Sequence, residues 1–158
     1  TPELPGSGGG ASHTGHAGGH GGGRVRIAAA GAVMIDGTID VAGHNCFADQ
    51  ASGGSGGSIL IECRTFAGGS GGLLRAPGGS TIGANGGGGG GGRIAVLYGD
   101  RLRADTPTSR LVPSAAPPSG FLGAVDVSAG TGYAEDGEVG TAVFLRILYP
   151  QGTMLLLQ

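Results

Sequence analysis

The stretch GANGGGGGGGRIAVLYGD, Gly83–Asp100, decides the fold, because it places seven consecutive glycines directly before a strong strand candidate. In that candidate Ile94, Val96 and Tyr98 occupy alternate positions, which is the two-residue period of a β-strand. A glycine run that serves as a flexible linker needs slack before the next element begins. No polar residue supplies that slack here, so we expect the glycines to be an ordered part of the fold.

The composition indicates a folded chain of one domain's length. Glycine and proline account for 39 and 8 of the 158 residues, which taken alone resembles a disordered sequence. However, only 13% of the residues are charged and 39% are hydrophobic, whereas disordered chains combine high charge with few apolar residues. We therefore expect an ordered protein, and because the chain begins at Thr1 rather than at a methionine, we expect a processed product or a fragment.

The charge pattern excludes several classes of partner and chemistry. The formal net charge is −2 and the sequence contains no lysine, so there is no basic stripe of the kind that neutralises phosphates and we expect no nucleic-acid partner. The absence of lysine also removes Schiff-base chemistry and the phosphate-binding lysine of a P-loop. No apolar run approaches the ~20 residues that span a bilayer, so we expect no membrane span.

A repeated unit of glycines, a polar anchor and alternating apolar residues runs along the chain. Its first three anchors, Arg24, Ser58 and Arg93, are 34 and 35 residues apart, and the fourth, Thr141, follows after 48. The Pro-rich insert 106–120 accounts for the longer last interval. Stacking these units would align Val25, Ile59, Ile94 and Val143 in one interior row. A second strand unit between the anchors would align another row, formed by Ile39, Ile82 and Val125.

The repeat predicts an all-β fold, a short right-handed parallel β-helix (solenoid) of three to four coils. Its glycine-rich arcs would resemble polyproline II, because glycines recur at every third position in places, as at Gly83, Gly86, Gly89 and Gly92. Stacked coils leave room for glycine alone where backbone approaches backbone. We expect a glycine- and histidine-rich N-terminal arm or arc over residues 1–23 and the β-helix domain over 24–158. A solvated flexible loop is the alternative for the glycine runs.

The segments GGSGGSILIE, STIGANGGGGGGGRIAVLYGD and GTAVFLR resemble glycine-rich extracellular β-helix repeats, which occur in secreted surface and filament proteins. The resemblance covers residues 21–146, and the insert 106–120 departs from the pattern. It implies a parallel β-helix with an extracellular or cell-surface role. It carries over no catalytic residue.

Cys46 and Cys63 are the only cysteines, 17 residues apart, and in a secreted protein they predict a disulfide. Closing a loop of that size would stabilise the fold by roughly 3 kcal/mol. The alternative pairs Cys46 with His44 as a nucleophile and its base. No third group that would orient such a pair is evident nearby.

Three further groups of polar residues suggest chemistry, and each has a simpler interpretation. The tract that contains His13, His16 and His20 would present imidazoles to a metal, but such tracts are typically mobile arms. The acidic turn YAEDGEVG lacks the ligand spacing of a calcium loop. Asp36 and Asp40 flank the residues GTI as acid/base candidates, and Asp40 would point outward, but the outward charges are few and dispersed. We therefore expect no metal site, no cofactor and no enzyme, while hydroxyls in the insert remain compatible with glycan attachment.

The ends of the chain favour assembly. The sequence finishes on apolar residues where an isolated repeat protein normally has a polar cap. We expect an assembly contact there, formed by Met154, Leu155, Leu156 and Leu157. The sequence thus predicts a structural subunit of an extracellular filament or surface appendage, a homo-oligomer joined head-to-tail through open β-helix ends. The alternatives are a ligand-binding module of a larger cell-surface adhesin and a carbohydrate-active β-helix enzyme.

Overall fold

The computed structural model describes residues 2–99, 110–114 and 116–148. These residues contain strands and no helix, so they include no helix long and apolar enough to cross a membrane. The strands are β1 (Arg24–Ala28), β2 (Ala32–Met34), β3 (Thr38–Asp40), β4 (Ser58–Cys63), β5 (Thr65–Ala67), β6 (Leu73–Arg75), β7 (Arg93–Gly99), β8 (Arg110–Ser114), β9 (Ala124–Asp126) and β10 (Thr141–Leu148).

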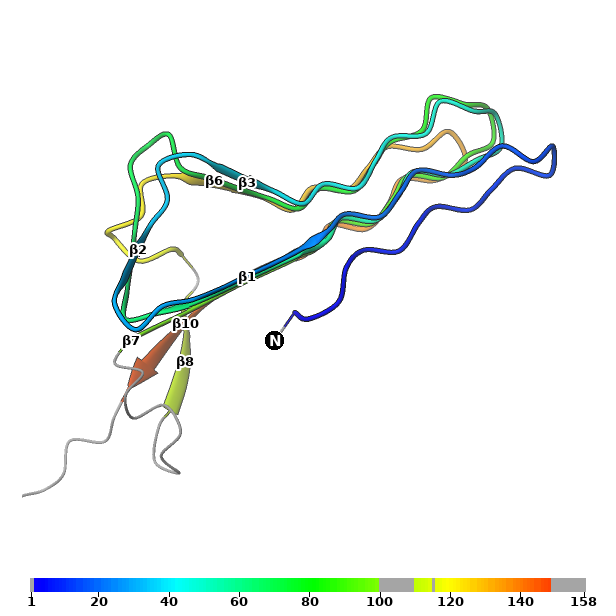
Figure 1. Cartoon of the computed structure of the whole chain (residues 1–158). Helices are drawn as coiled ribbons and strands as arrows, with labels where there is room; N and C mark the ends of the chain where they lie inside the picture. Colours follow the sequence, from blue (N-terminus) through cyan, green and yellow to red (C-terminus); the bar gives the residue numbers. More distant parts are fainter. Residues whose placement is uncertain (1, 100–109, 115, 149–158) are drawn as a thin grey trace, which may run out of the picture.

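Successive passes of the chain lie on top of one another, as the superposed colours in Figure 1 show. The largest sheet has the order β1-β4-β7-β10-β8, the second pairs β2 with β5, and the third has the order β3-β6-β9. The three sheets form the sides of a triangular part, from which glycine-rich segments extend as two long arms that run side by side. We call each pass of the chain through the triangular part and the arms a layer.

The predicted β-helix is wrong as a description of this architecture. The strands form three separate small sheets, and the largest is mixed, because β8 runs antiparallel to β10 while the other pairs are parallel. The antiparallel pair comes from the insert 106–120, in which Arg110–Ser114 forms β8 along the outer edge of β10. Pro113 of β8 lies opposite Leu145, and proline, which has no amide hydrogen, is tolerated on such an edge strand.

The first predicted interior row is confirmed for three of its four members. Val25 pairs with Ile59, and Ile59 pairs with Ile94. The fourth member is wrong by one residue, since Ala142 pairs with Ile94 and Val143 is exposed. The register follows from the start of β10, whose first residue lies opposite the first residue of β7.

The second predicted row contains one wrong member. Ile39 and Val125 are aligned, but the residue between them is Leu74 of β6 rather than Ile82. Ile82 is 74% exposed and follows Thr81, which forms an isolated bridge with Cys46 at the far end of the glycine arms. Leu74 precedes Ile82 in the chain and lies in β6, so it is Leu74 that occupies the interior position between Ile39 and Val125.

The hydrophobic core fills the triangular part between the three sheets. Its largest fully buried side chains come from β4 to β7: Phe66, Ile59, Ile61, Leu74, Ile94, Val96 and Cys63. Phe66 packs against Phe121 and Phe144 with ring centroids 4.9 and 6.3 Å away. One aromatic group therefore joins three successive layers inside the core.

The glycine arms are held by backbone hydrogen bonds that recur at every third residue. Gly53 donates to the Gly87 carbonyl and Gly56 to the Gly90 carbonyl, while Gly54, one residue further on, donates to His44 on a different segment. This spacing matches the three-residue turn of polyproline II, in which successive residues face different neighbours. A polypeptide in this conformation has no internal hydrogen bonds, so the neighbouring segments satisfy the backbone.

The N-terminal segment expected as an arm or arc packs against this arrangement over residues 2–23. Gly6 and Gly9 donate to the carbonyls of Gly22 and Gly19, and Ser52 donates to Gly10. This N-terminal segment thus lies as a further glycine-rich stretch along one side of the arms.

No disulfide joins Cys46 and Cys63, so the predicted bridge is absent from the structure. Cys46 lies in the glycine-rich half, opposite Thr81, and its thiol is 3.6 Å from the Ala17 carbonyl. Cys63 ends β4 within the core and pairs with Tyr98. The layer path places the two cysteines in different halves of the molecule although they are close in sequence.

Candidate functional site

One side of the layer stack ends in an open strand edge. Within the part of the chain that the structure describes, β1 pairs only with β4, and β3 only with β6. Ser58 donates to the Gly23 carbonyl and Ala29 donates to the Glu62 carbonyl, so alternate amides of β1 face β4 and the others face away from it. The amides on the open side belong to Arg24, Arg26 and Ala28.

Apolar side chains are incompletely covered at this edge. Ile59 and Ile61 in the second layer are 0% exposed, whereas the corresponding Val25 and Ile27 in the first layer are only half-buried. The partly buried core residues of the first layer are Val25, Ile27, Ala29, Ile35 and Ile39. We call these residues, together with the outward amides of β1, the open edge.

The opposite side of the stack is partly closed. β8 pairs with Phe144–Leu148 of β10 and covers the outer edge of this stretch. Thr141–Val143 and β9 have no strand beyond them among the described residues. Val125 and Val127 are half-buried there. The last layer is therefore covered by β8 at Phe144–Leu148 and open at Thr141–Val143 and β9.

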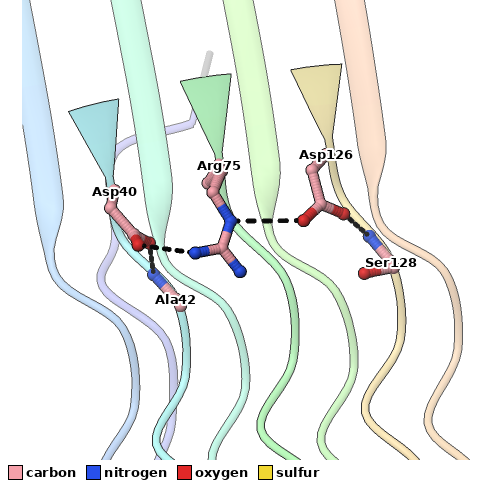
Figure 2. A network of polar contacts seen from close by, with 5 residues as sticks. All are labelled: Asp40, Ala42, Arg75, Asp126 and Ser128. Carbon is pink, nitrogen blue, oxygen red and sulfur yellow. Dashed lines mark hydrogen bonds and ion pairs between the residues drawn. The ribbon is translucent and has the colours of Figure 1, made fainter. Parts of the chain in front are cut away.

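A row of alternating charges crosses the third sheet, as Figure 2 shows. Asp40, Arg75 and Asp126 stand at the ends of β3, β6 and β9, so the parallel register brings them side by side. One Arg75 nitrogen lies 2.9 Å from the Asp40 carboxylate and another 3.3 Å from that of Asp126. The backbone amides of Ala42 and Ser128 donate to the same two carboxylates.

The charges of this row are paired with one another and with the backbone. The three side chains are 33–42% exposed, and ion pairs of that exposure contribute about 0–1 kcal/mol. Both carboxylates are already bound to Arg75 and to backbone amides. Asp40 points out of the layer as expected from the sequence, but Arg75 and Asp126 were not singled out there. In the sequence, Arg75 and Asp126 each stand two residues after the first residue of a strand that follows a glycine. This shared position is the signal that could have identified them.

The pKa of Asp126 is lowered, first by the backbone amide of Ser128, then by its hydroxyl and by the Arg75 guanidinium, against an opposing effect of burial. A lowered pKa means that the ionised form stabilises the fold above about pH 4 and that this contribution is lost as the pH falls through the lowered value. We expect Asp126→Asn to reduce the acid sensitivity of unfolding in urea. The same pH dependence in variant and wild type would contradict this assignment.

The other polar candidates are not brought together into a metal site. No group of three histidine, cysteine, aspartate or glutamate side chains among the described residues has a metal-binding arrangement. His13 and His16 lie in an exposed turn closed by a hydrogen bond from Ser12. In the acidic turn, Asp136 accepts a hydrogen bond from the Gly132 amide. The predicted assembly residues 154–157 lie outside the described residues.

The sequence named His44 only as a possible partner of Cys46 and did not indicate the polar face, with one exposed aromatic side chain, to which His44 belongs. His44, Asn45 and Phe47, which we call the His44 ridge, separate two open hollows of about 660 and 510 Å³. The rings of His44 and His20 pack edge-to-face with centroids 5.9 Å apart. Phe47 is 73% exposed. The ridge comes from the bend at the far end of one glycine arm, where sequence periodicity carries no signal.

Comparison with known proteins identifies no relative: no protein-family model, no curated protein and no solved structure matches the chain.

Proposed function

We propose that the protein is a structural subunit of an extracellular filament or surface appendage, in which copies join head-to-tail along the direction of layer stacking. The observation that carries the proposal is the open edge. It offers unpaired backbone amides and half-buried core side chains at the same place, and both are completed by a further layer. A second copy supplies that layer with the exposed side of its own last layer.

Apolar burial supports such a contact. Full burial of a large aliphatic side chain is worth about 1.5–3 kcal/mol. The half-buried Val25, Ile27, Ile35 and Ile39 would thus contribute about 3–6 kcal/mol in total before the cost of association. Strand pairing and the glycine arms add backbone hydrogen bonds. A head-to-tail contact that does not close a ring propagates into a fibre.

The last layer restricts how the next copy docks. Because β8 covers Phe144–Leu148, the joining copy places the end of its β1 opposite Thr141–Val143, the stretch of β10 that is left open.

The proposal assigns an extracellular location and a mechanical role, without catalysis or a cofactor. Two observations support the mechanical role: backbone hydrogen bonds join neighbouring segments of the glycine arms, and strands of successive layers pair with one another. Because each layer is bonded to its neighbours along its length, the subunit is suited to transmit load along the stack.

Sedimentation velocity and negative-stain electron microscopy of the purified chain test the proposal. We expect concentration-dependent fibres with an axial repeat of about 19 Å for four layers spaced about 4.8 Å apart. A chain that stays monomeric at high concentration and at every ionic strength would overturn it. A native protein that runs as one much longer polypeptide on a denaturing gel would favour the adhesin alternative instead.

A further inference from the structure

The His44 ridge and its two hollows form a surface that the filament proposal does not use. The first hollow is lined by the ridge with His16, His20 and Asp49, and the second by the ridge with Arg75, Ser80 and Ser128. These residues come from successive layers, so the two hollows follow one another along the stacking direction. From this arrangement we infer that the surface is a binding site for a neutral polysaccharide chain.

The polar groups of this surface are held in place before any ligand binds. The Asn45 side-chain oxygen accepts a hydrogen bond from the Ser80 amide at 2.7 Å, so its NH₂ group remains as a donor toward the surface. The Ser80 hydroxyl accepts from the Thr131 amide. Arg75 is fixed between two carboxylates. Groups with fixed orientations lose little freedom on binding, which favours affinity.

The charge of the surface selects for a neutral ligand. The single positive charge of Arg75 is paired with Asp40 and Asp126, so these three residues together carry a net negative charge. Asp49 adds a further carboxylate to the first hollow. An acidic polymer would be repelled, whereas sugar hydroxyls both donate to carboxylates and accept from the Asn45 and Arg75 donors.

The shape of the surface suits a linear sugar chain. The exposed Phe47 ring provides an apolar platform for the C–H face of a pyranose, and the T-shaped His20–His44 pair extends it. Layers are spaced by about 4.8 Å, a length comparable to one pyranose unit in a linear chain. A polysaccharide that runs along the stack would therefore meet one layer with each sugar.

Affinity gel electrophoresis of the full chain tests the inference with four neutral polysaccharides: hydroxyethyl cellulose, mannan, arabinoxylan and dextran. We expect at least one of them to retard the wild-type protein. Phe47→Ala should weaken that retardation about tenfold, the size expected when an aromatic contact and its buried area are lost. Leu122→Ala is the control, because Leu122 is 70% exposed, follows Phe121 in the triangular part and lines neither hollow.

A second variant separates binding from structure. Asn45→Asp keeps the oxygen that accepts from the Ser80 amide but removes the NH₂ donor, so it should weaken retardation while the folded spectrum is unchanged. Retardation by alginate or heparin alone would overturn the inference, as would the absence of retardation by all four neutral polymers. An equal loss in Phe47→Ala and Leu122→Ala would likewise show that the surface is not the site.

Discussion

Replacing Gly89 by alanine should destabilise the fold by more than about 3 kcal/mol, and Gly89→Val should prevent folding. Gly89 lies at the centre of the glycine arms, where its amide donates to Gly79 and its carbonyl accepts from Gly130. A Cβ at this position would meet the carbonyl oxygen and carbon of Gly54. Inserting a carbon into a packed core costs about 1–3 kcal/mol, and here the obstructing atoms are backbone atoms that cannot rotate away.

The neighbouring Gly90→Ala is the matched control. The nearest atom to a Cβ at Gly90 is the Glu138 carbonyl oxygen at 3.7 Å, which is ordinary contact. Alanine at a tolerant position restricts the unfolded chain and stabilises by about 0.4–1 kcal/mol. Urea denaturation followed by circular dichroism should therefore move the midpoint down for Gly89→Ala and leave it unchanged or raised for Gly90→Ala. Equal midpoints would restore the flexible-linker interpretation of the glycine run.

The contrast between these adjacent glycines shows what the sequence could predict about the arms. The absence of slack before Ile94 correctly indicated that the run is ordered. A uniform run of glycines, however, has no internal marker of which residues face a neighbouring backbone and which face solvent. That distinction depends on the position of each residue in the three-residue turn, which only the neighbouring segments determine.

The strands could be predicted where anchors and alternating apolar residues coincide, as in the row of Val25, Ile59 and Ile94. The prediction failed where a different segment competed for the interior. Leu74 displaced Ile82 from the second row, because a three-residue strand carries too short a pattern to be recognised by periodicity. The insert was identified as a departure from the repeat, but its antiparallel return as β8 depends on long-range pairing with β10.

The candidate sites were less predictable than the core. Arg75 and Asp126 acquire their roles from the layer register, which places residues 35 and 51 positions apart side by side. The predicted disulfide failed for the same reason, since the layer path separates cysteines that are near in sequence. Proximity in this fold follows from the layer period, and sequence distance alone is a poor guide to it.

Ala28→Pro should abolish filament formation while it leaves the subunit folded. Ala28 is exposed, and the alternation along β1 turns its amide toward the open edge. A proline there removes a donor that the incoming strand requires and places its ring in the path of that strand, but breaks no hydrogen bond inside the subunit. Unfolding stability should change by no more than about 1 kcal/mol, within the range of most exposed substitutions. The concentration needed for fibres in sedimentation should rise by at least about tenfold, which corresponds to 1.4 kcal/mol.

Ala29→Pro tests whether the orientation of the amide is the cause. The Ala29 amide donates to the Glu62 carbonyl at 2.9 Å, so a proline one residue later removes a hydrogen bond between the first two layers. This variant should lose roughly 3 kcal/mol of unfolding stability by analogy with proline placed inside other hydrogen-bonded elements. Fibres of normal length from folded Ala28→Pro would eliminate the open edge as the joint. If the two prolines instead destabilise the subunit equally, the amides of β1 do not alternate between β4 and the open side, and the edge is not available for a second copy.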